Sequence, residues 1–326
     1  MLVGLLLICL AAISWGTTGA TMTLLARDAA AGPLLVGWAR LAVAAPCLLL
    51  AAWISQRRAA IAVPATAPRP WTAADTAGCL VLGAAMAAYQ VCYFRAVTLT
   101  GVAVAALLAI CSAPLMIALL AGALLQERLT PVIRLSLVMA VTGTALLVVG
   151  PRGLGEISGG FGWGALSALG AGLSYAVYAV AAKRLLLRMA PLPQAAATFT
   201  LAALLLSPVL LAERAVGAQL AAGWPLLLYL GLGPTAASYA LFTIGLARVP
   251  ATLAGIATLL EPLTAATLGL LWFGESLGLA GAIGAALLLA GLALLAVAPS
   301  RGGEGLRPRR PSARPAGRCA PALPRS

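Results

Sequence analysis

The chain has 326 residues, of which 62% are hydrophobic and 9% are charged, and its mean hydropathy is +1.04. A soluble domain carries about 25% charged residues, so this composition excludes a soluble protein and predicts an integral membrane protein. The net charge of +13 does not predict nucleic-acid binding, because the basic residues lie mostly in short loops and in residues 299–326. The chain has no histidine, which excludes His-ligated metals and Ser-His catalysis, and we expect neither a metal nor a cofactor.

Ten apolar stretches have about the 20 residues that a helix needs to cross a bilayer. They cover roughly residues 2–25, 33–54, 74–97, 101–125, 131–150, 161–182, 192–212, 224–247, 250–273 and 277–298. With the N-terminus inside, 16 Lys and Arg residues fall on the inner side of these stretches and 3 fall on the outer side. Because basic residues concentrate in cytoplasmic loops, this distribution predicts a multi-pass protein of a bacterial inner membrane with both termini in the cytoplasm.

The second half of the chain repeats the first, because residues 105–149 match residues 253–297 at a shift of 148. Other stretches align at shifts of 150 and 160. The paired positions include Pro114 and Pro262, Glu127 and Glu275, Gly143 and Gly291, Trp15 and Tyr175, and Tyr89 and Tyr239. Five helices per copy force the copies to cross the membrane in opposite senses, which is typical of transporters. The sequence therefore predicts an all-α integral membrane fold built from two inverted five-helix repeats.

This duplication divides the chain into four parts. We predict a first five-helix repeat over residues 1–150, an inter-repeat loop over 151–160, a second repeat over 161–298 and a basic tail over 299–326. The tail is rich in Arg, Pro and Gly and has little apolar surface to bury, so we expect it to be disordered.

Two sets of short motifs occupy matching places in the halves. The first half has Ala113-Pro114-Leu115 and Gln126-Glu127-Arg128-Leu129, and the second has Glu261-Pro262-Leu263 and Gly274-Glu275-Ser276-Leu277. With these motifs, residues 1–298 resemble the EamA-type transporters of the drug/metabolite transporter superfamily. The resemblance implies ten transmembrane helices around a central cavity, with helices two and seven outside the others and the halves rocking to give alternating access. The Trp and Tyr positions also resemble those of amino-acid exporters of the YddG type.

Charged residues inside predicted spans are costly in lipid and tend to face a cavity or a partner. Glu261 lies near the middle of the ninth span, beside Pro262, which favours a helix kink. It is either a proton-coupling or amine-binding carboxylate or a structural cap, and Ala113 takes its place in the first repeat. Arg40 is either a contact for a substrate carboxylate or a side chain that snorkels to the interface. Arg95, near the outer end of the third span, is either a gate or substrate-carboxylate contact or a side chain that reaches the interface.

Aromatic residues lie within the spans instead of at their ends. Tyr89 and Tyr93 share one helix face, as do Tyr175 and Tyr178. We predict that such residues, with polar residues on neighbouring helices, line a cavity for an amphipathic substrate; the alternative is ordinary helix packing. The candidate cavity residues are Trp15, Thr18, Tyr89, Tyr93, Tyr175, Tyr178, Tyr239, Thr243 and Glu261.

Glu127 and Glu275 directly precede the fifth and tenth spans. A carboxylate near the beginning of a helix interacts favourably with the helix dipole. We therefore expect each of them to cap the span that follows it and to have no direct part in transport.

Together these features predict a secondary transporter that exports small metabolites, chiefly neutral or aromatic amino acids, by alternating access. One alternative is an exporter of cationic drugs or polyamines, because a lone carboxylate among aromatic rings suits a cation. A membrane enzyme lacks support, since no paired carboxylates lie inside the spans, and a structural membrane protein is a distant alternative. The expected partners are a small-molecule substrate and the lipid bilayer, without nucleic acid; the sequence leaves monomer and dimer open.

Overall fold

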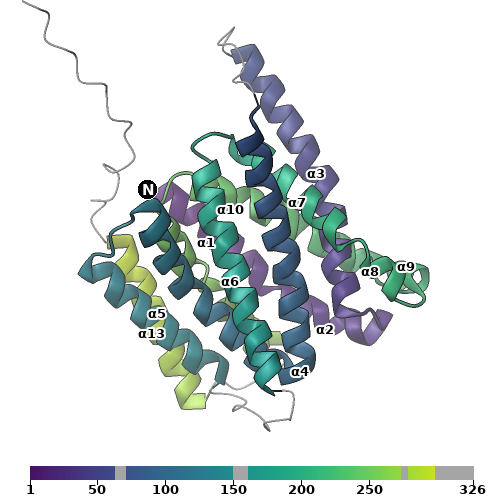
Figure 1. Ribbon diagram of the computed structural model, residues 1–326. Coiled ribbons are helices and arrows are strands. Elements are labelled where there is room, and N and C mark those ends of the chain that lie inside the picture. Colours follow the sequence, from purple (N-terminus) through teal and green to yellow (C-terminus); the bar gives the residue numbers. More distant parts are fainter. Residues whose placement is uncertain (63–70, 150–160, 273–277, 298–326) are drawn as a thin grey trace, which may run out of the picture.

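The computed structural model describes residues 1–62, 71–149, 161–272 and 278–297, and the regular elements in these ranges are helices (Figure 1). Within these ranges, eight helices are long and apolar enough to cross a membrane. Two shorter apolar helices, Pro131–Leu146 and Gly278–Leu294, occupy the fifth and tenth predicted spans. The predicted all-helical membrane fold is thus confirmed, while the expectations for residues 151–160, for the tail and for Glu275 fall outside the described residues.

The first repeat forms five helical elements. The first predicted span is divided at Thr17 into two helices, and the third and fourth spans belong to one long element. These elements are α1 (Leu2–Gly16), α2 (Thr18–Ala29), α3 (Pro33–Ala62), α4 (Ala73–Leu125) and α5 (Pro131–Val149).

The second repeat is broken more often. Its seventh, eighth and ninth spans are each divided into shorter elements, and one of these is a π-helix. The elements are α6 (Phe161–Leu185), α7 (Pro191–Leu206), α8 (Val209–Ala212), α9 (Val216–Leu230), η1 (Gly231–Ala237), α10 (Ser238–Leu246), α11 (Ala251–Ala257), α12 (Leu260–Trp272) and α13 (Gly278–Val297).

The long element α4 turns back on itself. Thr100 lies against the beginning of α6, and Gly78 lies against the end of α6. Ser112 then lies against Gly172 in the middle of α6, so the chain reverses its direction between Thr100 and Ser112. The two halves of α4 are therefore separate spans, as the apolar stretches predict.

The crossing of α5 and α13 has the two-fold exchange expected of an inverted repeat. A Cβ atom on Gly143 would lie 2.6 Å from the nitrogen of Leu288, and a Cβ atom on Gly291 would lie 3.1 Å from the nitrogen of Ala140. These two contacts exchange when each residue is replaced by its equivalent at the shift of 148. The hydroxyl of Ser136 also donates to the carbonyl of Gly291 at 2.7 Å. Such a self-complementary contact requires the two helices to be related by a two-fold axis.

A second pair of equivalent contacts joins the two repeats, near the beginning of α1 and near the beginning of α6. A Cβ atom on Gly4 would lie 2.8 Å from a methyl group of Val249, and one on Gly164 would lie 2.9 Å from Cβ of Leu99. Gly4 and Gly164 are equivalent at the shift of 160, and Leu99 and Val249 at the shift of 150. Glycine at both places allows the helix backbones to approach closely, as is common in membrane bundles.

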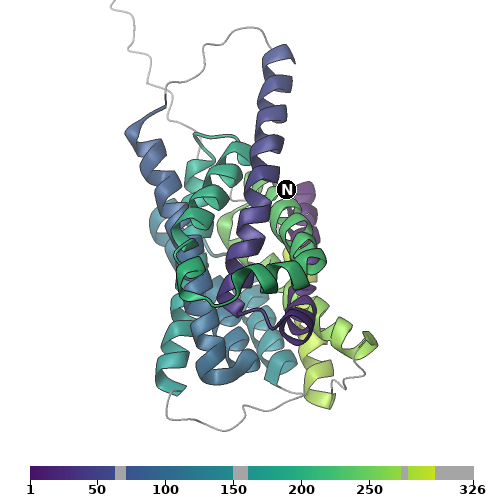
Figure 2. The same cartoon turned by 90° about the vertical axis from the view of Figure 1, so that its right-hand side faces the viewer.

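Several helix boundaries differ from the predicted ones. The helix α3 continues to Ala62, and its final turns project beyond the neighbouring helices (Figure 2). Pro46 and Pro114 lie inside continuous helices, whereas the helix breaks near Pro208 and becomes π-helical around Pro234. Proline removes one backbone hydrogen bond in each case, and the packing around it decides whether the helix continues.

Candidate functional site

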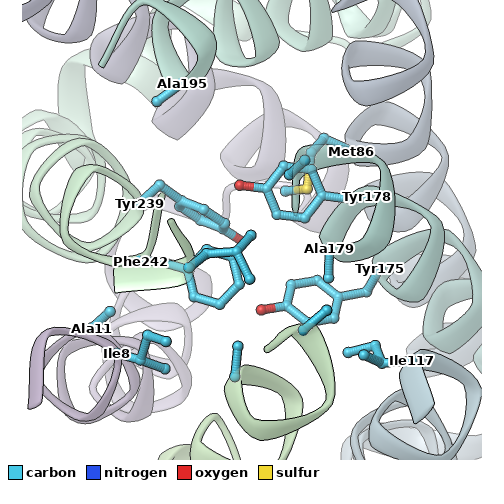
Figure 3. Close-up of a cluster of buried hydrophobic side chains, with 14 of the residues drawn as sticks. Ile8, Ala11, Met86, Ile117, Tyr175, Tyr178, Ala179, Ala195, Tyr239 and Phe242 are labelled. Carbon is cyan, nitrogen blue, oxygen red and sulfur yellow. The ribbon is translucent and has the colours of Figure 1, made fainter. Parts of the chain in front are cut away.

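A group of aromatic side chains lies in the middle of the bundle, and we call it the aromatic cluster. Its rings come from α1, α4, α6, α7 and α10, which are far apart in the sequence. The members are Trp15, Tyr89, Tyr93, Tyr175, Tyr178, Phe199, Tyr239 and Phe242. The Trp15 and Tyr239 ring centroids are 4.7 Å apart, and those of Tyr89 and Tyr175 are 5.9 Å apart. In Figure 3, Tyr175 and Tyr178 approach Tyr239 and Phe242 from the opposite helix.

The cluster brings together six of the predicted cavity residues. Trp15 is the second-last residue of α1, directly before the break at Thr17. Tyr239 is the second residue of α10, directly after the π-helix. Both rings therefore lie at places where the regular helix is interrupted, and interruptions of this kind are typical of the binding sites of transporters.

Glu261 lies beside the cluster at a third interruption. The helix α11 ends at Ala257, Thr258 caps it, and α12 begins at Leu260. The amide of Glu261 still donates to the carbonyl of Thr258 at 3.0 Å, so the chain makes a tight turn between the helices. The predicted interruption near Pro262 is therefore present. It also faces the break in the first span, because a Cβ atom on Gly16 would lie 2.7 Å from the Glu261 carbonyl oxygen.

Two buried polar atoms of the cluster lack a hydrogen-bond partner in the described part of the chain. They are Nε1 of Trp15, whose residue is 6% exposed, and the hydroxyl of Tyr175, whose residue is 8% exposed. The Tyr175 hydroxyl points away from α6, toward the helices across the cluster (Figure 3). Buried polar groups in proteins nearly always have a partner, so these atoms indicate a place for a ligand or water.

Arg40 reaches the cluster from α3. The amide orientation of Gln90 is assigned from its neighbours, because the opposite orientation would point its N–H groups at the N–H groups of Arg40. With this assignment the Gln90 oxygen accepts hydrogen bonds from Nε of Arg40 at 3.1 Å and from Nη2 at 3.3 Å. Gln90 is 1% exposed and directly follows Tyr89 in α4. The resemblance implied that the second span lies outside the cavity, but its arginine side chain extends inward through this contact.

The opposite charges of Arg40 and Glu261 act on the same rings. The Arg40 guanidinium interacts electrostatically with Glu261 and with the hydroxyls of Tyr89, Tyr93 and Tyr239. The Glu261 carboxylate acts on the same three hydroxyls and on Tyr175. Both Arg40 and Glu261 are half-buried. The site thus has a positive and a negative group around one set of aromatic rings.

Sequence reasoning missed Gln90. The residue is a polar side chain in the middle of an apolar span, which is itself a signal in a membrane protein. A search for a partner for Arg40 among such residues would have found it. The register between α3 and α4 was needed to connect the two side chains.

Three other predicted site residues have different surroundings. Thr18 is half-buried at the beginning of α2. The hydroxyl of Thr243 donates to the carbonyl of Tyr239 at 2.7 Å, so it satisfies the backbone of its own helix. Arg95 is exposed, and its neighbour Phe94 is buried. The predicted gating role of Arg95 stays a prediction.

Glu127 connects the two repeats at the end of the bundle where Met1 lies. Its carboxylate accepts hydrogen bonds from the amide of Ala251 at 2.6 Å, and from the amide and hydroxyl of Thr252 at 3.0 and 2.8 Å. Ala251 is the first residue of α11, so Glu127 satisfies free N–H groups of that helix. The prediction that Glu127 caps the span directly after it was wrong, because the helix end nearest to it in space belongs to the other repeat.

A second charged region lies at the same end of the bundle. Nε of Arg188 is 3.0 Å from the Asp75 carboxylate, beside a cavity of about 210 Å³ whose wall includes Trp71 and Gln56. The Asp75 carboxylate also accepts from the amide and hydroxyl of Thr72. These charges pair with one another, in contrast to the charges around the aromatic cluster. Among the described residues, no group of three His, Cys, Asp or Glu side chains could hold a metal ion.

The fold and the site define a class of protein. A helical membrane bundle built from two related halves, with polar groups at facing helix breaks near its middle, is the architecture of a secondary transporter. The sequence profile of the EamA-like transporter family matches residues 2–149 and 162–297. The chain belongs to this family, and it is therefore a membrane transporter and not an enzyme.

Individual relatives agree with this assignment. The chain is 36% identical to the uncharacterized transporter YwfM of Bacillus subtilis (strain 168) over 307 residues, which cover 91% of this chain and 94% of the relative. It is 33% identical to an uncharacterized transporter of Archaeoglobus fulgidus over 200 residues, which cover 61% of this chain and 69% of the relative. A solved crystal structure is similar in fold, with a TM-score of 0.70 and 22% identity over 89% of this chain and 95% of the other.

Proposed function

We propose that this transporter exports amino acids with neutral or aromatic side chains across the bacterial inner membrane, with both termini in the cytoplasm. The observation that supports the proposal is the set of unpaired polar groups inside the aromatic cluster. Trp15 Nε1 and the Tyr175 hydroxyl are buried and have no partner within the described ranges, and Glu261 lies beside them at a helix break. A small amphipathic molecule would satisfy these groups and would cover the rings with its apolar part.

Alternating access follows from the arrangement of the repeats. The substrate site lies where the interrupted spans of the two repeats face each other, so rocking one repeat against the other would open the site to one side at a time. The halves meet through glycine-mediated contacts at Gly4 and Gly164, which allow close packing with little side-chain interlocking.

Export of organic cations or polyamines is the second candidate. It is favoured by the Glu261 carboxylate, which has no hydrogen-bond or ion-pair partner in the described part of the chain and lies near several tyrosine rings. Aromatic rings around a carboxylate attract cations. The positive charge of Arg40 at the same rings opposes this function.

Flux into sealed proteoliposomes separates these candidates. We expect labelled phenylalanine to exchange across the membrane in the presence of the purified protein, and polyamines to neither move nor compete. Measurements with and without a pH gradient show whether transport is coupled to protons or is facilitated. Flux of polyamines without flux of amino acids would contradict the proposal, and protein-free vesicles provide the background.

A further inference from the structure

We propose that the site recognises both charged ends of a neutral α-amino acid, with Glu261 binding the ammonium group and Arg40, held by Gln90, binding the carboxylate. This inference rests on the proposed function and names the groups that select the substrate. It also makes Gln90 a positioning residue, which acts on the substrate through Arg40.

The first part of the argument is the number of hydrogen-bond donors on Arg40. A guanidinium has five N–H donors, and Gln90 takes one from Nε and one from Nη2. Within the described part of the chain these are its hydrogen bonds, so three donors stay free. Since the Gln90 amide is neutral, the guanidinium keeps its full charge, and a planar guanidinium binds a carboxylate in a two-bond geometry. The same contact holds Arg40 within the bundle and prevents it from extending to the membrane surface.

The second part concerns the charge balance of the site. Arg40 and Glu261 interact electrostatically, yet no ion pair within 4.0 Å joins them in the described residues. Two opposite charges that act on the same rings without pairing would both be satisfied by a ligand that has both charges itself. A substrate with one charge would leave the other protein charge without a partner, and an unpaired charge in a membrane interior is costly.

The third part concerns the rest of the ligand. The walls around these charges are aromatic, and Trp15 and Tyr175 each provide a donor that has no partner among the described residues. Within the same residues, no acidic or basic side chain other than Glu261 and Arg40 interacts electrostatically with the four tyrosines that Glu261 acts on. The side chain of the substrate is therefore uncharged, and an aromatic or large apolar group fits rings that otherwise pack on one another.

The test compares phenylalanine with two analogues that each lack one charge. Phenethylamine lacks the carboxylate, and 3-phenylpropionate lacks the ammonium group. Each competes against labelled phenylalanine for the purified full-length protein. We expect both analogues to bind roughly 10- to 100-fold more weakly than phenylalanine, because each loses one charged hydrogen-bonded contact.

Substitutions then assign each end of the substrate. Arg40→Gln removes the preference for phenylalanine over phenethylamine, and Glu261→Gln removes the preference over 3-phenylpropionate. Gln90→Glu places a carboxylate beside the guanidinium and compensates its charge, so it changes the preference in the same direction as Arg40→Gln. A purely structural role of Gln90 would instead weaken the binding of all three ligands equally. Arg58→Gln is the matched control, because Arg58 is exposed in the final turns of the same helix α3 and lies outside the predicted site, and it leaves every ratio unchanged. Ratios between ligands are compared within one variant, so a loss of folded protein cannot imitate the result.

Each outcome decides the question. Equal binding of phenylalanine and both analogues to the unchanged protein, with phenylalanine still transported, would overturn this inference and leave the proposed function intact. If phenylalanine is neither bound nor transported, both are wrong. Preferential binding of phenethylamine would overturn the inference in favour of a cationic substrate.

Discussion

The crossing of α5 and α13 and the turn between α11 and α12 differ in how they use the duplication. In the crossing, Gly143 and Gly291 make the same contact from both repeats. At the turn, Glu261-Pro262 follows a helix break, while the equivalent Ala113-Pro114 lies inside the continuous helix α4. The two equivalent prolines therefore differ in their local structure. The glycines that both repeats share hold the two halves together at this crossing, whereas the carboxylate that only the second repeat has lies at the proposed substrate site.

The largest change in stability is expected at the symmetric crossing. Gly143→Ala places a methyl group 2.6 Å from the Gly284 carbonyl oxygen and the Leu288 amide, which are backbone atoms that cannot rotate away. We expect a loss of about 1–3 kcal/mol, measured as the free energy of unfolding in detergent. The equivalent variant of the second repeat, Gly291→Ala, should lose a similar or slightly smaller free energy of unfolding, because the backbone atom nearest to its added methyl group is 3.0 Å away.

Gly162 provides the control for this experiment. A Cβ atom there meets nothing within 4 Å, so Gly162→Ala should be neutral or stabilising by up to about 1 kcal/mol. A loss at Gly162 as large as that at Gly143 would show that the crossing has no special role.

A smaller loss of stability is expected where Glu127 of the first repeat contacts α11 of the second. Glu127→Ala removes three hydrogen bonds to the beginning of α11, and we expect it to cost about 0.5–2 kcal/mol in the free energy of unfolding. Asp28→Asn is the control, because the ion-pair partner of Asp28 among the described residues is its exposed neighbour Arg27. This substitution should change stability by less than about 0.5 kcal/mol. Equal stability of the Glu127→Ala variant and the unchanged protein would contradict the assigned contact.

The most gradual effect is the dependence of substrate binding on pH. The ammonium group binds the ionised form of Glu261, so affinity for phenylalanine should be present at high pH and decrease as this carboxyl becomes protonated. In Glu261→Gln the affinity should be weak and independent of pH. Equal pH dependence in both proteins would assign the titration to another group. Among the described residues, the ionisable groups that interact electrostatically with Glu261 are Arg40, Tyr89, Tyr93, Tyr175 and Tyr239.

The spans and their pairing could be predicted from the sequence because they depend on hydropathy along the chain. Hydropathy shows where a helix leaves the bilayer and not where the helix ends. It therefore missed the final turns of α3, in which polar residues such as Gln56 and Arg57 continue the helix. It also missed the break at Thr17, which has no proline nearby. Both features depend on surroundings that a single stretch of sequence does not contain.

The candidate site was only partly predictable. Six of its aromatic members could be found because they lie inside spans that the resemblance places around a cavity. Phe242 was missed, and so was Phe199, which lies in α7, a span that the resemblance places outside the cavity. The contacts of Arg40 with Gln90 and of Glu127 with α11 join residues 50 and 124 positions apart, and only the packing of the helices brings them together. The polar residues of the neighbouring helices had two interpretations, cavity lining and helix packing. The hydroxyls of Thr235, Thr243 and Thr258 donate to carbonyls three to five residues earlier in the same spans.

The most direct test of the role of Glu261 compares the unchanged protein with the Glu261→Ala variant in proteoliposomes. The measurement is the rate at which each protein exchanges labelled phenylalanine. This substitution gives the second repeat the residue that the first repeat has at Ala113. We expect the unchanged protein to exchange phenylalanine and the variant to lose at least roughly tenfold in rate, with an unchanged melting temperature. Equal exchange by the two proteins would contradict the central role of Glu261.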